Sequence, residues 1–228
     1  MLVVALRQVT WLLLLPWLCA LVNTIFQSLT RANAWSAEAF ALVGGGAIAA
    51  ITCQLFRPLW LIYVAGHELT HALWALLFGQ RVTAIKIRKT GGHVMLSGTN
   101  SLITLAPYFF PLYGVVWLAL AHGLNRWTPF RVADWVTAFG FGGTYMLHLV
   151  MTAKVLRFRQ PDIESEGYVF STVVVLLGNL AMGLVLCPVA FGVLRFRELA
   201  SEVWVNSGWC LEWMSRKVGL LTGLTRTF

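Results

Sequence analysis

Long apolar segments alternate with short polar connections along most of the chain. Each segment is close to the length of about 20 residues that a helix needs to cross the hydrocarbon core of a bilayer. The pattern predicts an all-α polytopic membrane protein with about six transmembrane helices, built as one membrane-embedded domain over residues 1–228. We expect the spans within residues 1–26, 39–56, 59–78, 101–120, 136–155 and 168–194.

Two segments depart from this pattern. Residues 80–98 alternate apolar and polar side chains on either side of Gly91 and Gly92, which predicts a short β-hairpin directly after the third span. Residues 196–228 mix several tryptophans with scattered charges, which is typical of a helix lying in the membrane interface. An exposed hairpin edge can pair with an extended peptide, whereas the other interpretation is an ordinary basic interfacial loop.

Composition agrees with a membrane setting. Hydrophobic residues make up 58% of the chain and charged residues only 11%, well below the share of about 25% in soluble domains. The net charge is +8, but no dense basic block is present, so we expect contact with lipid and no binding to nucleic acid. The four cysteines are scattered and form no C-x-x-C pair, which indicates core residues rather than a thiolate metal site.

The N-terminal apolar segment allows two interpretations. A retained first span is one, and a signal peptide is the other, because Ala32-Asn33-Ala34 resembles a cleavage sequence.

The basic residues of the loops predict how the protein is oriented in the membrane. Residues 80–98 and residues 154–159 both carry lysine and arginine without an acid, which places both on the cytoplasmic side.

The segment 59–78 holds the strongest candidate for chemistry. His67, Glu68 and His71 form an H-E-x-x-H motif in the middle of this apolar helix. Residues four apart lie on one helix face, so both imidazoles can bind one zinc ion, and the carboxylate between them can accept a proton from water. The alternative is a buried polar cluster that ties helices together, although ionisable groups at this depth are costly.

The motif HELTHALWALLFG within a membrane helix, followed by Gly91-Gly92-His93-Val94 in a short β-like segment, resembles the site-2 protease family of intramembrane zinc metalloproteases. The similarity extends over about residues 59–180 and is greatest to the compact M50B-like branch. The resemblance implies that His67 and His71 bind zinc and that Glu68 is the general base and acid. It also implies a distant aspartate as the third ligand.

The position of that aspartate is the hardest to assign among the residues that the resemblance implies. No L-D-G sequence is present, and the resemblance favours Asp162, with Glu164, Glu166 and His148 as substitutes. If residues 59–78 cross the membrane, His71 lies about 10 Å below Phe78 by helical rise. Asp162 must then belong to a segment that dips inward or that opens the next helix.

The expected function is zinc-dependent cleavage of membrane-protein or peptide substrates, with one Zn²⁺ per chain and an active site towards the cytoplasmic leaflet. Gly92 and His93 are candidates for substrate binding, and Asn100 either orients substrate or caps a helix. The alternatives are a non-catalytic scaffold or pseudoprotease that retains the fold, and a metal transporter. A transporter would need several polar residues along a path through the spans, and the apolar spans supply few.

Overall fold

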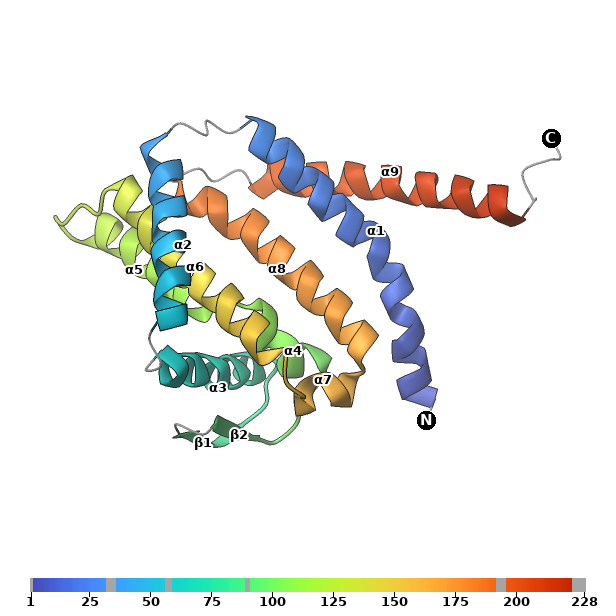
Figure 1. Cartoon of the computed structure of the whole chain (residues 1–228), viewed down its shortest axis with the longest axis horizontal. Helices are drawn as coiled ribbons and strands as arrows, with labels where there is room; N and C mark the ends of the chain where they lie inside the picture. The colour runs from blue at the N-terminus through green and yellow to red at the C-terminus, as the bar shows by residue number, and fades with distance from the viewer. Residues whose placement is uncertain (1, 32–35, 56–58, 89–90, 192–195, 223–228) are drawn as a thin grey trace.

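The computed structural model describes residues 2–31, 36–55, 59–88, 91–191 and 196–222. Nine helices and two strands lie within these ranges (Figure 1). In chain order the elements are α1 (Leu2–Arg31), α2 (Ala37–Leu55), α3 (Leu59–Leu77), β1 (Val82–Arg88), β2 (Gly91–Leu96), α4 (Ser101–Phe109), α5 (Leu112–Trp127), α6 (Asp134–Val155), α7 (Pro161–Glu166), α8 (Tyr168–Ala190) and α9 (Phe196–Thr222). The cleavage-like sequence at 32–34, the hairpin residues 89–90 and the last six residues of the C-terminal segment fall outside the described residues.

Three described helices are long and apolar enough to cross a membrane: α1, α2 and α8. A fourth span results if α4 and α5 count as one, although they meet at a bend of 71°. The helices α3 and α6 are long enough, with 19 and 22 residues, but they are not among the helices that meet the same test of apolar character. The chain is therefore a membrane protein, and the expected count of six spans is not reached on these criteria.

The predicted hairpin is confirmed, except that Gly91 and Gly92 belong to β2 and pair with Arg88 and Ile87 instead of separating the strands. β1 and β2 pair antiparallel, with Ile85 opposite Val94 and Lys86 opposite His93. Because side chains alternate along a strand, Gly92 and Val94 share one face with Ile85, while Lys86 and His93 share the other. In Figure 1 the hairpin lies below α3, and α3 runs crosswise to α2, α6 and α8.

The main hydrophobic core joins the helices that surround α3. Its buried side chains come from α2, α3, α4, α6, α7 and α8 and include Tyr63, Leu105, Tyr108, Met151 and Ile163. Tyr63 of this core lies one helical turn before His67, so the core adjoins the H-E-x-x-H face of α3 and supports it.

Small residues bring α2 and α6 into close contact. A Cβ atom on Gly45 would overlap the carbonyl oxygen of Phe139, and one on Gly142 would overlap that of Leu42. Glycine therefore lets the two backbones touch, as is common between membrane helices. The glycine run in α2 serves helix packing.

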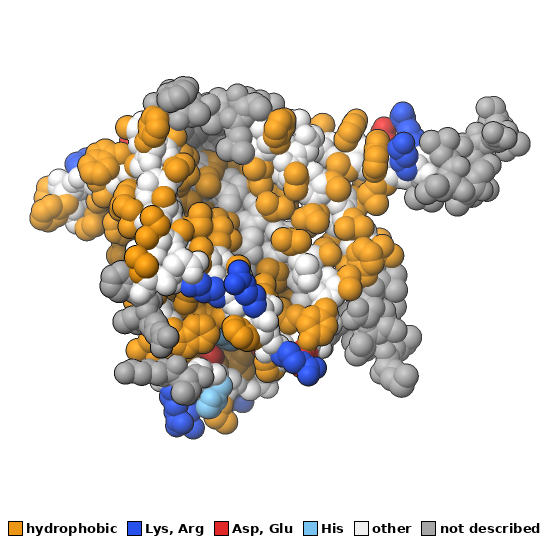
Figure 2. Space-filling view, in the orientation of Figure 1, with side chains coloured by type: hydrophobic (Ala, Val, Ile, Leu, Met, Phe, Trp, Pro, Cys, Tyr) orange, Lys and Arg blue, Asp and Glu red, His pale blue; other side chains and the backbone are white. Residues whose placement is uncertain are grey.

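The face of the molecule seen in Figure 2 is largely apolar, as a membrane setting requires. Lys and Arg side chains gather mainly at the end that carries the hairpin and the segment following α6. Arg88, Arg157 and Arg159 are exposed there. The two basic segments expected on one side of the membrane thus lie at the same end of the molecule.

The last helix, α9, packs against α1 through a buried polar contact. The Asn206 side chain donates a hydrogen bond to Thr24 Oγ1 at 2.9 Å and accepts one from Asn23 at 3.0 Å. Trp204, Trp209 and Trp213 are exposed elsewhere on the helix. This combination of a polar buried face and an apolar exposed face fits a helix in contact with lipid.

Candidate metal centre and active site

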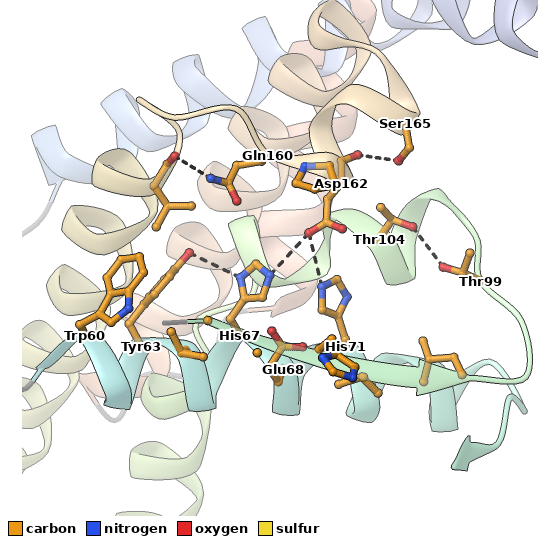
Figure 3. Close-up of a pocket in the computed structure, with 18 of the residues that line it drawn as sticks. Trp60, Tyr63, His67, Glu68, His71, Thr99, Thr104, Gln160, Asp162 and Ser165 are labelled. Carbon is orange, nitrogen blue, oxygen red and sulfur yellow. Dashed lines mark hydrogen bonds and ion pairs between the residues drawn. The ribbon is translucent and has the colours of Figure 1, made fainter. Parts of the chain in front are cut away.

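His67 and His71 lie on one face of α3, and Asp162 on α7 reaches the same point from the other side (Figure 3). Asp162 Oδ2 lies 3.5 Å from the Nε2 atom of each histidine. One ligand atom from each of the three residues lies within 4.8 Å of the others, and no other such group of three occurs among the described residues.

Backbone and side-chain partners orient these groups. His71 Nδ1 donates to the carbonyl oxygen of Ile103 at 2.9 Å, which leaves Nε2 as the atom with a free lone pair. His67 Nδ1 lies 3.5 Å from the Tyr63 hydroxyl. Both imidazoles therefore present Nε2 to Asp162, which is the arrangement that a shared metal ion needs.

Asp162 is ionised in this setting. Burial by itself raises the pKa of the carboxyl, but the imidazoles of His67 and His71 beside it outweigh burial and hold the pKa well below its usual range. An ionised carboxylate and two imidazoles make a donor set typical of catalytic zinc sites.

The substitute ligands point elsewhere. Glu164 forms an ion pair with Arg159 at 2.6 Å and accepts a hydrogen bond from Tyr168 at 2.9 Å. These two partners lower the pKa of the Glu164 carboxyl. Glu166 is buried and accepts a hydrogen bond from Ser101 at 2.6 Å. On α6, the Nε2 atom of His148 lies 3.2 Å from the side-chain oxygen of Asn179.

Glu68 lies next to the cluster in a cavity of about 820 Å³. Its side chain is only 6% exposed, and among the described residues none is hydrogen-bonded to its carboxylate. A Cβ atom on Gly92 would lie 2.6 Å from Glu68 Cγ and 2.8 Å from Oε1, so the bare backbone of β2 packs directly on this side chain. Gly92 thus lets strand β2 cover the motif closely.

The cavity is bounded by α3 on one side and by β2 and α7 on the others (Figure 3). Gly92 and His93 are among the lining residues, together with the three cluster residues and Glu68. Asn100 is not among them. Its side chain accepts a hydrogen bond from the Ile103 backbone N–H at 2.9 Å and caps the start of α4.

Several lining residues were not anticipated from the sequence. Tyr63 precedes His67 by one helical turn, so the repeat of aromatic and imidazole groups at 63, 67 and 71 is a signal that the sequence does contain. Trp60, Gln160 and Ser165 also line the cavity. Their roles depend on how α7 meets α3, and no local pattern reveals that contact.

Comparison with known proteins supplies the deciding observation. A family model described as peptidase M50B-like matches residues 39–182, which is more than half of the chain and includes α3, the hairpin and α7. The chain belongs to the peptidase M50B-like family. No curated protein and no solved structure matches it.

Membership of the M50B-like family indicates a metallopeptidase in a membrane setting. The family is zinc-dependent in general, and the His67, His71 and Asp162 group offers suitable ligands. The site residues that the family resemblance implies thus come together at one point from α3 and α7.

Proposed function

We propose that this M50B-like protein is a zinc-dependent intramembrane endopeptidase that hydrolyses peptide bonds in membrane-protein or peptide substrates. One observation carries the proposal. A buried glutamate lies beside a His-His-Asp group, within a cavity that is also bounded by the strand β2.

The distances from Asp162 to the two imidazoles fit zinc. Bonds of about 2.0–2.2 Å in a tetrahedral site put neighbouring ligand atoms about 3.3–3.6 Å apart. The two distances from Asp162 Oδ2 to the imidazole nitrogens are both 3.5 Å. Three protein ligands also leave a fourth position for water or substrate, as a catalytic site requires.

A bound zinc ion supplies Lewis acidity towards water and towards a peptide carbonyl. The protein groups supply the rest. Glu68 accepts a proton from the attacking water and delivers it to the departing amine. His71 keeps its orientation through the Ile103 carbonyl, and the cavity of about 820 Å³ beside it has room for water and substrate.

The strand β2 is suited to hold the substrate. Its only strand partner among the described residues is β1, and residues 91–94 and 96 line the cavity. An extended peptide paired along β2 would run past Glu68, whereas a helical peptide bond is shielded by its own hydrogen bonds. Gly92 and His93 contribute backbone contacts in this arrangement. Asn100 contributes indirectly, by capping α4.

The proposed topology has six membrane-embedded segments, in which the bent pair α4–α5, α6 and the crosswise α3 join α1, α2 and α8 (Figure 1). The polar residues of α3 and α6 are shielded by neighbouring helices of the bundle. Basic residues at the hairpin end support an active site towards the cytoplasmic leaflet, with α9 in the interface.

Purified protein in detergent provides the test. We expect about one zinc per chain, and cleavage of a model transmembrane substrate that stops when zinc is chelated. Glu68→Gln should retain zinc and fold normally but lose cleavage, because the amide cannot accept the proton. Glu212→Gln, the same change at an exposed position on α9, is the matched control.

The scaffold hypothesis predicts a different outcome. If Glu68→Gln leaves the biological activity of the protein intact, or if the wild type binds no metal, the protease assignment is wrong. Metal flux into liposomes would instead identify a transporter.

A further inference from the structure

Tyr108 contacts two of the three candidate ligands at once. It is fully buried, with 0% of its surface exposed. Its hydroxyl donates a hydrogen bond to Asp162 Oδ2 at 2.9 Å, and this is the oxygen that lies 3.5 Å from both imidazoles. Its ring meets the His67 ring edge to face, with centroids 5.2 Å apart and planes at 87°.

Tyr108 is itself held in place. Its carbonyl is among the last four of α4, which have no partner within a helix. The Asn179 side chain on α8 donates to this carbonyl at 2.8 Å. Helix α4 also supplies the Ile103 carbonyl that orients His71. Thus α4 contacts all three candidate ligands, through one backbone carbonyl and one tyrosine.

The contact with Asp162 orients a flexible group. A carboxylate can rotate about its side-chain bonds, and α7 is a helix of only six residues. The hydroxyl of Tyr108 fixes one carboxylate oxygen facing the histidines. Because a carboxylate oxygen has two lone pairs, it can accept this hydrogen bond and still bind a metal. Partners of this kind change metal affinity by about 10- to 100-fold when removed.

We infer that Tyr108 is a positioning residue for the third metal ligand and strengthens zinc binding through its hydroxyl. This inference rests on the proposed metalloprotease site. Tyr108 is not among the residues that line the cavity, and it is fully buried, so it does not touch substrate. Its effect passes through Asp162.

The test compares zinc affinity in full-length variants in detergent, by competition with a chromophoric chelator. Tyr108→Phe keeps the ring and its packing, so it should fold, and we expect a zinc affinity about 10- to 100-fold weaker than that of the wild type. Tyr145→Phe is the matched control, since this hydroxyl donates to the Asn179 backbone carbonyl instead of to a ligand. It should leave zinc affinity unchanged.

A double-mutant cycle separates positioning from general stability. In an Asp162→Ala background, Tyr108→Phe should cause no further loss of zinc affinity, because its target is gone. An unchanged affinity in Tyr108→Phe, an equal loss in Tyr145→Phe, or a full additive loss in the Asp162→Ala background would each overturn the inference.

The two proposals can fail separately. A protein that binds zinc in a Tyr108-dependent way but cleaves nothing would refute the protease function and retain the positioning role. An active protease whose zinc affinity ignores Tyr108 would refute the positioning role alone.

Discussion

Replacing Gly92 with alanine tests whether the close contact between the hairpin and Glu68 matters for catalysis. The added Cβ would lie 2.6 Å from Glu68 Cγ, whereas ordinary van der Waals contact begins at 3.4 Å. Either β2 or the glutamate must therefore move by about 0.8 Å. A misplacement of about 1 Å in a catalytic group can cost about 100-fold in rate. We expect kcat to fall about 10- to 100-fold, or about 1.4–2.7 kcal/mol of transition-state stabilisation.

The same substitution should leave the metal site intact. Gly92 does not have a positive φ, so alanine fits its backbone, and Glu68 is not among the candidate ligands. Zinc content and the apparent Tm in detergent should match the wild type. Gly44→Ala is the control, because nothing lies within 4 Å of the new Cβ. Wild-type kcat in Gly92→Ala would show that Glu68 is not held in its working position by β2.

Two further substitutions test the interpretation of other residues. Asn100→Ala removes the cap of α4 and should lower stability by about 0.5–2 kcal/mol, measured by thermal unfolding. KM should stay unchanged because Asn100 does not line the cavity, and a large rise in KM would instead assign it to substrate binding. Gly45→Leu should lower the apparent Tm strongly, since its side chain would overlap the Phe139 carbonyl, whereas Gly44→Leu on the same helix should be tolerated. Equal effects of the two leucines would contradict the α2–α6 contact.

Features encoded over short stretches were predictable from the sequence. The H-E-x-x-H spacing defines one helix face, and α3 covers residues Leu59–Leu77, within one residue of the expected segment. The alternation around Gly91 and Gly92 defines the hairpin in the same way. In both cases the residues that carry the pattern are close in the chain, so local geometry is sufficient.

Features that depend on distant contacts were not predictable. The expected span at 101–120 is broken into α4 and α5, with a bend of 71° at Phe110 and Pro111. Proline in the sequence permits such a break, but its angle depends on packing against distant elements, since α4 shares a core with α3 and α8. The hydrogen bond from Tyr108 to Asp162 joins residues 54 positions apart and leaves no local pattern.

The identity of the third ligand depends both on the local sequence and on contacts between distant elements. Sequence reasoning left three acids open within five residues, Asp162, Glu164 and Glu166. Once residues 161–166 form a helix, geometry separates them, because each residue turns the chain by about 100°. Glu164 then lies on the opposite face from Asp162, where it meets Arg159.

Glu166 returns to nearly the same face one turn later and reaches Ser101 at the start of α4. Only Asp162 is left facing α3. The expectation that Asp162 belongs to a segment that dips inward or that opens the next helix assumed that residues 59–78 cross the membrane. Because α3 runs crosswise to α2, α6 and α8 (Figure 1), a short helix between α6 and α8 brings Asp162 over the histidines without a long re-entrant segment. The choice of ligand thus follows from the crossing of α3 together with the short helix α7 that precedes Gly167.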